Sequence, residues 1–374
     1  MKVLIFSNIP SPYRIDFFNE LGKNIELTVV FEAKTANGIK FNWNIDQIHH
    51  FNAIFLKDGD INEKKIDWSI LKYVKKNKYD HIIVTSYAYL TEMVALIALK
   101  ILKIPYFMEI DGGLIRKENV LKKRLKSFLI SNASGYFSPS KSSDDYLVYY
   151  GAKKDLIFRY PFTSLKERDI IDELISKEEK IELRKELGIT EKKVILAVGQ
   201  FIHRKGFDVL LKACRELDNE IAIIFVGGIP TNEYNEFKNR YNLRNVHFEG
   251  FKTKEELHRY FKAADIFVLP TREDVWGLVI NEAMGFGLPI ISTNKCVAAL
   301  ELVNNNENGY IVEVNDHKSI YKSIVKILGD DDLRTQMSWN SLQTIKKYTI
   351  ENMAGSHLSV FLNICKDKYK KDGY

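Results

Sequence analysis

Two acidic side chains, Asp274 and Glu282, stand eight residues apart in the segment TREDVWGLVINEAMG, with Gly277 between them. Asp274 lies in a loop after the apolar run 266–269, and Glu282 lies about one turn inside a helix predicted by the apolar spacing after Gly277. Such a helix start offers backbone amides and the positive end of the helix dipole, which together bind phosphate. Carboxylates beside an anion site favour hydroxyl groups over further negative charge. The segment therefore predicts a site for a phosphorylated, hydroxyl-rich ligand such as a nucleotide sugar.

This segment resembles the Glu-x7-Glu signature of retaining glycosyltransferases of family 4. Its Glu-Asp and Trp-Gly pairs and its Asn-Glu-Ala triplet all match that signature. By this resemblance the first acid contacts the donor sugar and the second contacts the ribose. The second position falls on Glu282, and the first falls on Asp274, where the family more often has Glu. Glu273 is adjacent, so either carboxylate is a candidate for the sugar contact. The alternative is an ordinary strand-loop-helix unit with surface acids.

A second loop, GQFIHRKG at residues 199–206, is bounded by glycines and joins a predicted strand to a helix. In relatives this loop carries an Arg-x4-Lys pair that holds the donor diphosphate. Lys205 matches the lysine, but Gln200 stands where arginine is usual. Arg204 is the candidate that supplies the missing charge. The alternative is that Arg204 and Lys205 are two solvated surface bases.

The resemblance implies further donor contacts in the second half of the chain. Gly227 belongs to a turn that resembles a donor-side glycine turn. Phe251 falls where relatives place the nucleobase, and it either packs on the base or covers the core. The other expected donor contacts are at the helix start, at Gly277, Leu278 and Val279.

Two candidates come from the first half of the chain. Arg14 follows the opening strand and loop. In the two-domain fold that the resemblance implies, this loop faces the cleft between the domains, so Arg14 contacts either the donor phosphate or the acceptor. Its alternative is a helix-start arginine in solvent. Asp111 follows the predicted strand 105–108 and precedes two glycines, so it either accepts hydrogen bonds from a sugar or caps a turn.

Apolar runs alternate with amphipathic segments along both halves, which predicts an α/β protein with a parallel, doubly wound sheet in each half. The resemblance implies the GT-B fold, in which two Rossmann-like domains face a cleft. The predicted strands are 2–7, 25–31, 81–85, 105–108 and 135–138, then 194–198, 221–226, 246–248, 266–269 and 289–292. The predicted divisions are an acceptor domain 1–162, a charged helical linker 163–190, a nucleotide-sugar domain 191–345 and a helical segment 346–374 that returns to the first domain.

Composition and charge narrow the class of protein. The 374 residues are 45% hydrophobic and 28% charged, which is typical of a globular protein of about two domains. No apolar run is long enough to span a membrane and no signal peptide opens the chain, so we expect a cytoplasmic protein. The sequence contains no Cys-x-x-Cys pair and no Asp-x-Asp that follows a predicted strand, which are motifs typical of metal sites. We therefore expect neither a metal nor a cofactor.

The net charge of +6 is clustered. One cluster runs from Lys117 to Lys126, where Val120, Leu121, Leu125, Phe128 and Leu129 recur on one helical face. Such a helix either lies on an anionic membrane surface or covers the sheet with its lysines in solvent. The first alternative makes the protein peripheral on the inner face of the plasma membrane. Nucleic acid is excluded as a partner because no binding motif accompanies the charge.

The resemblance implies a metal-independent hexosyltransferase that moves a sugar, with retention, from a nucleotide-diphosphate donor. UDP-sugar is favoured over GDP-sugar, and the acceptor is a saccharide or lipid-linked saccharide in bacterial surface polysaccharide synthesis. A sugar-nucleotide epimerase or a phosphorylase is disfavoured, since neither the acids of the first nor the cofactor lysine of the second can be located. A nonenzymatic sugar-nucleotide sensor or partner subunit stays open, because Asp274 and Gln200 depart from the family pattern.

Overall fold

The computed structural model describes residues 1–35, 45–62 and 64–371, and the side chains of its last helix up to residue 364. The chain divides into two units. The first comprises Met1–Ser164 and Thr349–Tyr374, and the second comprises Leu165–Tyr348. The second unit thus includes most of the segment 163–190, and the final helix belongs to the first unit.

The first unit contains a seven-stranded sheet in the order β3-β2-β1-β4-β5-β6-β7. Every adjacent pair is parallel. The strands are β1 (Lys2–Ser7), β2 (Glu26–Phe31), β3 (Asn52–Phe55), β4 (His81–Val84), β5 (Phe107–Glu109), β6 (Gly135–Ser138) and β7 (Ile157–Arg159). The strand order reverses between β1 and β4, so the carboxyl ends around these strands form a switch point of the kind that binds ligands in open α/β sheets. The sequence analysis missed β3, an edge strand whose four residues are all partly or fully exposed.

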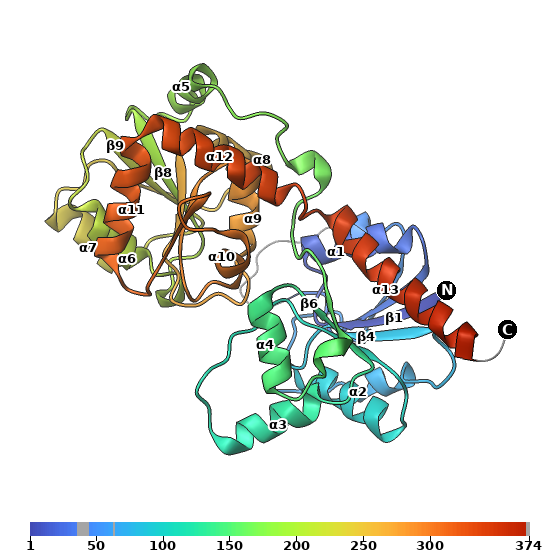
Figure 1. Cartoon of the computed structure of the whole chain (residues 1–374). Helices are drawn as coiled ribbons and strands as arrows, with labels where there is room; N and C mark the ends of the chain where they lie inside the picture. The colour runs from blue at the N-terminus through green and yellow to red at the C-terminus, as the bar shows by residue number, and fades with distance from the viewer. Residues whose placement is uncertain (36–44, 63, 372–374) are drawn as a thin grey trace. The chain divides into compact units, whose positions relative to one another are not determined.

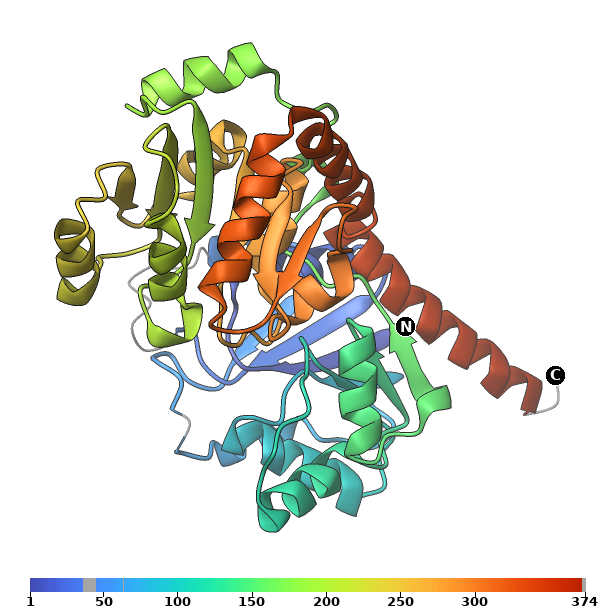
Figure 2. The same ribbon diagram turned by 60° about the vertical axis from the view of Figure 1, so that its left-hand side comes forward.

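Helices cover this sheet (Figure 1). They are α1 (Pro12–Gly22), α2 (Leu90–Ile101), α3 (Val120–Ile130), α4 (Lys141–Tyr149) and α13 (Ile350–Lys371), with short 3₁₀ turns η1 (Ile45–Gln47), η2 (Trp68–Lys72) and η3 (Lys154–Leu156). Pro12 starts α1, where its fixed φ suits the first helical turn. The final helix α13 packs against α1, and Figure 2 shows it as a long, uninterrupted helix.

The second unit contains a six-stranded parallel sheet in the order β10-β9-β8-β11-β12-β13. The strands are β8 (Lys193–Val198), β9 (Ile221–Val226), β10 (Val246–Glu249), β11 (Ile266–Leu269), β12 (Ile290–Thr293) and β13 (Gly309–Val312). The helices are α5 (Lys177–Glu186), α6 (Phe207–Cys214), α7 (Asn232–Arg240), α8 (Lys254–Ala263), α9 (Leu278–Gly285), α10 (Val297–Leu302), α11 (His317–Gly329) and α12 (Asp331–Ile345), with turns η4 (Glu167–Asp169) and η5 (His203–Lys205). The order reverses between β8 and β11, which are the strands that precede the two predicted ligand loops.

The charged segment 163–190 contains α5, which packs against α8 of the same unit. Arg184 of α5 is buried, and its guanidinium donates to the carbonyl of Ala263 at 2.8 and 2.9 Å and to Asp265 at 2.8 Å. Asp265 in turn accepts from the backbone N–H of Val194 at 2.8 Å. A buried ion pair of this kind fixes α5 to the starts of β8 and β11.

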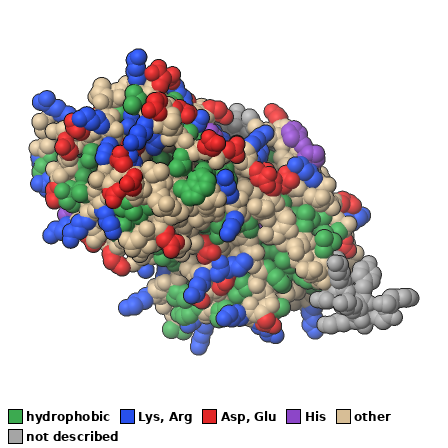
Figure 3. All heavy atoms as spheres, turned by 45° about the horizontal axis from the view of Figure 1, so that its top comes forward, with side chains coloured by type: hydrophobic (Ala, Val, Ile, Leu, Met, Phe, Trp, Pro, Cys, Tyr) green, Lys and Arg blue, Asp and Glu red, His purple; other side chains and the backbone are tan. Residues whose placement is uncertain are grey.

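The surface carries charges of both signs. On the face that Figure 3 shows, basic and acidic side chains are interspersed. Across the part of the chain that the structure describes, no helix combines the length and the apolar character that crossing a bilayer requires.

Candidate functional site

The loop between β11 and α9 carries Asp274, and its backbone is fixed by the turn that follows β12. The Asp274 N–H donates to the carbonyl of Lys295 at 2.9 Å, and its own carbonyl accepts from Val297 at 3.3 Å. Gly277 closes the loop at φ 104°, where a Cβ atom would lie 2.7 Å from the sulfur of Cys296. Only glycine therefore fits between this loop and the helix start.

The loop 199–206 is pressed against the loop after β11. Gly206 has φ 67°, and a Cβ there would lie 2.1 Å from the carbonyl oxygen of Pro270. The carbonyl of Arg204 accepts from the backbone N–H of Arg272 at 2.7 Å and from the hydroxyl of Thr271 at 2.9 Å. The tertiary structure thus joins two loops that lie about 70 residues apart in the chain.

Both predicted bases converge on Asp274. The Lys205 ammonium lies 2.6 Å from one carboxylate oxygen, and the Arg204 guanidinium lies 3.1 Å from the other. Arg204 also donates to the Glu273 carbonyl at 3.0 Å. Lys205 and Asp274 are each only 13% exposed, whereas Arg204 is 48% exposed. One carboxylate balances only one of the two cations, so the cluster keeps positive charge that favours an anionic ligand.

An arginine that the sequence analysis missed holds this arrangement together. Arg272 binds both oxygens of Asp208 at 2.7 and 2.8 Å and donates to the carbonyl of His203 at 2.6 Å. Burial alone raises the pKa of Asp208, but the bond from Arg272 outweighs it, and the pKa is lowered overall. The bidentate pair ties the loop after β11 to α6. Its signal in the sequence is weak, because nothing but adjacency to two acids distinguishes Arg272.

Helix α9 starts where the sequence analysis expected it. Leu278 and Val279 occupy its first turn, and Glu282 lies half-buried one turn further on. The buried indole N–H of Trp276 donates to Asn281 at 2.8 Å, which fixes the helix start to the preceding loop. The expected phosphate-binding helix start and the ribose candidate are thus on one rigid element.

The other predicted donor residues lie on nearby loops of the same unit. Gln200 is exposed. Gly227 has φ 129°, and a Cβ there would lie 2.6 Å from the carbonyl oxygen of Gly199, so the turn after β9 contacts the loop after β8. Phe251 is 60% exposed, so the alternative in which it covers the core is wrong.

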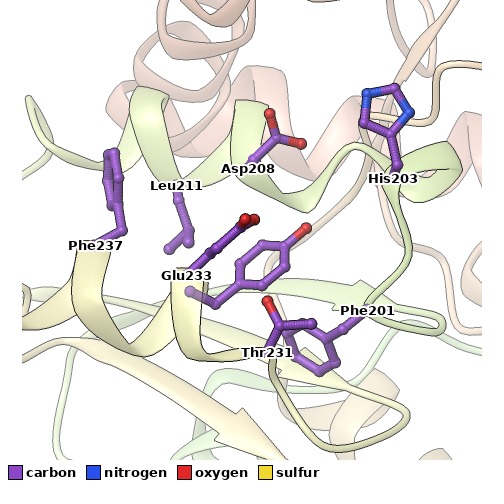
Figure 4. A pocket seen from close by; sticks show the side chains of 8 residues that line it. Phe201, His203, Asp208, Leu211, Thr231, Glu233 and Phe237 are labelled. Atoms are coloured by element: carbon purple, nitrogen blue, oxygen red, sulfur yellow. The ribbon is translucent and has the colours of Figure 1, made fainter.

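A pocket of about 310 Å³ lies between the loop 199–206, α6 and α7 (Figure 4). Its lining is largely aromatic, with two carboxylates, and consists of Phe201, His203, Asp208, Leu211, Thr231, Glu233, Tyr234 and Phe237. None of the site residues predicted from the sequence lines this pocket. Asp208, which pairs with Arg272, is one of the lining residues, but Arg204 and Lys205 are not.

In the first unit, a second cluster of charged side chains lies at the carboxyl end of β5. Arg14 of α1 binds Glu109 with one amino group and Asp111 with the other. The hydroxyl of Tyr13 donates to Asp111 at 3.0 Å. His357 of α13 contacts the second oxygen of Glu109 at 3.2 Å. His357 gave no signal in the sequence, since a lone histidine in a distant helix is not distinguishable from a core residue.

The exposed fractions of these side chains exclude one of the two alternatives for Arg14. Arg14 is 3% exposed, so the alternative of a solvated helix-start arginine is wrong. Burial by itself raises the pKa of Glu109, but Arg14 and His357 outweigh it and hold the pKa at about 2. Asp111 keeps 32% of its side chain exposed, so it is the member of the cluster that a ligand can reach.

The basic segment from Lys117 to Lys126 comprises the residues just before α3 and the first part of that helix. Of the five apolar residues predicted on one face of this helix, only Leu129 is buried. The other members are exposed, namely Val120 at 66%, Leu121 at 77%, Leu125 at 49% and Phe128 at 52%. For these four residues the alternative in which the helix covers the sheet is wrong.

The architecture of the two units is that of the GT-B fold, as solved structures show. The Anabaena protein Alr3699/HepE, crystallised in complex with UDP, is 18% identical and superposes with a TM-score of 0.80 over 97% of this chain and 100% of that chain. WaaG, a glycosyltransferase involved in lipopolysaccharide biosynthesis, is 14% identical, with a TM-score of 0.66 over 96% of this chain and 99% of that one. The prediction of two doubly wound parallel-sheet domains is confirmed.

The family comparison concerns the second unit. Residues 179–344 match the model of the family described as Glycosyl transferases group 1. This part of the chain contains every donor-side residue discussed above except Arg14. The second unit therefore carries the sequence pattern of group 1 glycosyltransferases.

Curated relatives extend this likeness. An uncharacterized glycosyltransferase of Haemophilus influenzae is 31% identical over 175 residues, which is 46% of this chain and 49% of that protein. Protein CapJ of Staphylococcus aureus is 26% identical over 90% of this chain and 82% of its own length. Apart from CapJ, the chain spans about half the length of the first curated relatives it matches.

Proposed function

We propose that the protein is a retaining, metal-independent hexosyltransferase that uses a nucleotide-diphosphate sugar. The observation that carries this proposal is the convergence of Lys205 and Arg204 on Asp274, beside the start of α9 and one turn from Glu282. The group 1 family match covers these residues. A UDP-sugar is the favoured donor, because the similar HepE protein was crystallised with UDP.

In this proposal the second unit, Leu165–Tyr348, holds the donor. The ribose hydroxyls bind Glu282, and the diphosphate lies against the start of α9 and the two bases. Both oxygens of Asp274 face those bases in the free protein. When the diphosphate binds, it competes for the bases and leaves Asp274 able to accept hydrogen bonds from sugar hydroxyls, with Glu273 as its neighbour.

The chemical step needs the departing diphosphate to be stabilised. Lys205, Arg204 and the amides of α9 are already oriented in the folded protein, so they stabilise the growing charge without reorganising. Two cations and a helix start supply the charge that a divalent ion supplies elsewhere. Retention of configuration then requires the acceptor hydroxyl to attack from the side that the diphosphate leaves.

The first unit, Met1–Ser164 with Thr349–Tyr374, is assigned to the acceptor. Asp111 is its accessible carboxylate, and Arg14, fixed by Glu109, orients Asp111. The burial of Arg14 favours its acceptor-side role over direct contact with donor phosphate. A saccharide or a lipid-linked saccharide offers the hydroxyl groups that such a carboxylate recognises, as expected for surface polysaccharide synthesis.

Glu282→Ala tests the donor assignment. Loss of a charged hydrogen-bond partner should weaken UDP binding by about 10- to 150-fold and abolish transfer of a radiolabelled sugar. The control is Glu236→Ala, which removes an exposed carboxylate from α7. Unchanged UDP affinity in a folded Glu282→Ala protein contradicts the assignment, and UDP-sugar binding without transfer to any acceptor indicates a sensor instead.

A further inference from the structure

The pocket of about 310 Å³ between α6, α7 and the loop 199–206 is not used by the proposed donor site. Two of its lining residues, Phe201 and Tyr234, are each only 8% exposed. Their rings meet edge to face, with centroids 5.2 Å apart and planes at 76°. Phe201 also packs edge to face on Phe207 and Phe248, at 5.4 and 5.5 Å. Rings that are packed on several sides keep their positions, so this part of the lining is a preformed apolar surface.

Two polar side chains from the start of α7 also line the pocket (Figure 4). Thr231 is the N-cap residue of α7, but its side chain makes no capping hydrogen bond, so capping does not occupy its hydroxyl. Glu233 lies in the first turn of the helix and is exposed. A hydroxyl and a carboxylate in these positions can accept hydrogen bonds from hydroxyl groups of a ligand.

The charges around the pocket disfavour an ionic ligand. Asp208, the second carboxylate of the lining, binds Arg272 at 2.7 and 2.8 Å, and the Lys212 ammonium lies 3.8 Å from it. A cationic ligand would be repelled by these two bases, and an anionic ligand would be repelled by Asp208 and Glu233. A carboxylate bound to arginine still has lone pairs that accept hydrogen bonds. The lining therefore suits a neutral ligand that has both hydroxyl groups and an apolar face.

We propose that this pocket is a second saccharide site, which binds one neutral sugar residue of a glycan. An apolar C–H face of the sugar ring packs on the aromatic side chains, and its hydroxyl groups bind Glu233 and Thr231. The pocket is at the lower end of the size range of small-molecule sites, about 300–1,000 Å³, which suits a single sugar ring.

This site is separate from the donor site. Lys205, Arg204, Asp274 and Glu282 do not line the pocket, so a nucleotide and a sugar residue can be bound at the same time. The identification of the ligand as part of a glycan rests on the proposed function, because a glycosyltransferase extends such chains. The preference for a neutral, hydroxylated ligand follows from the pocket itself.

Saturation-transfer difference NMR of the full chain tests the proposal. The probes are the methyl glycosides of glucose, galactose and N-acetylglucosamine. We expect at least one of them to bind with a millimolar Kd, and to bind equally well when saturating UDP is present. Glucose 6-phosphate and choline are the charged comparison ligands, and both should bind more weakly than that glycoside.

Three variants test the lining residues. Glu233→Ala should weaken glycoside binding by about tenfold, because a hydrogen bond to a charged group is lost. Thr231→Ala should weaken it by about threefold and leave the Tm unchanged, since no capping bond is lost. Phe237→Leu replaces a half-buried ring of the lining and should weaken binding severalfold. The matched control is Glu236→Ala, an exposed carboxylate of the same helix that does not line the pocket, which should bind as the parent does.

Three results would overturn the second saccharide site. They are a lack of binding by every glycoside, displacement of the bound glycoside by UDP, and equal glycoside binding by Glu233→Ala and Glu236→Ala. Tighter binding of glucose 6-phosphate or choline than of any glycoside would show that the class of ligand is wrong. UDP affinity measured on the same samples keeps the two proposals apart. If the parent binds UDP and no glycoside, only the second site is rejected; if Glu282→Ala keeps both ligands, only the donor assignment is rejected.

Discussion

Replacement of Lys205 by methionine tests the centre of the proposed donor site. The change keeps most of the side-chain volume and removes the ammonium that lies 2.6 Å from Asp274, with both groups 13% exposed. In the free protein Arg204 still pairs with Asp274 at 3.1 Å, so the carboxylate is not left alone. We therefore expect a loss of about 1.5–3 kcal/mol in the free energy of unfolding, the range for a hydrogen bond to a charged group.

The effect on catalysis should be larger. In a closed site one unpaired phosphate charge costs more than at the surface, because the effective dielectric constant is lower. A loss of about 3 kcal/mol of transition-state stabilisation corresponds to a fall in turnover of about two orders of magnitude. Turnover is measured with radiolabelled UDP-sugar at saturating donor, and chemical denaturation gives stability separately.

The chain offers a matched control in Lys212, whose ammonium lies 3.8 Å from Asp208 and whose side chain is 50% exposed. Lys212→Met should change stability by less than about 1 kcal/mol, as exposed ion pairs generally do, and should leave turnover near that of the parent. The reasoning is refuted if Lys205→Met is folded and turns over at the parental rate, or if both lysine variants lose activity equally.

Three other predictions follow from the same structure. Arg204→Ala should lower turnover by up to about two orders of magnitude, and Gln200→Ala should lower it far less, because a neutral amide contributes only an ordinary hydrogen bond. If turnover is near normal in Arg204→Ala and severely reduced in Gln200→Ala, Gln200 itself is the ligand. Glu109 has a pKa of about 2 instead of the ordinary 4.5, so it contributes stability that is complete above about pH 4.5 and is lost as the pH falls toward 2, up to roughly 3 kcal/mol. Urea unfolding across this range should show a flatter pH dependence for Glu109→Gln, and an unchanged slope would contradict the Arg14 pairing. Transfer should persist in excess EDTA, since cations and amides supply the charge; loss of activity that manganese restores would show a metal requirement.

Much of the fold was predictable from local pattern. Apolar runs and glycine-bounded loops predicted strands β8, β9 and β11 and the start of α9 at Leu278 to within a residue or two. Buried parallel strands are continuous apolar runs, so they are easily recognised in a sequence. The exposed edge strand β3 was missed because its half-exposed residues give no such run.

Some residues of the candidate site could likewise be predicted from the sequence, and others could be identified only from the structure. The strand-loop-helix pattern around Gly277 indicated Asp274 and Glu282, and the family resemblance indicated Lys205; both are carried by short stretches of sequence. The pair of Arg272 with Asp208 and the contact of His357 with Glu109 join residues 64 and 248 positions apart. No periodicity or spacing links such distant residues.

The amino-acid sequence by itself thus determined the α/β class, the two-domain organisation and the loops that carry the charged residues. The tertiary structure alone decided that both bases share Asp274, that Arg14 is buried between two carboxylates, and that the apolar face of α3 is exposed. The physical reason is that strand and helix formation depend on neighbours along the chain, whereas burial and ion pairing depend on which elements the sheet order brings together.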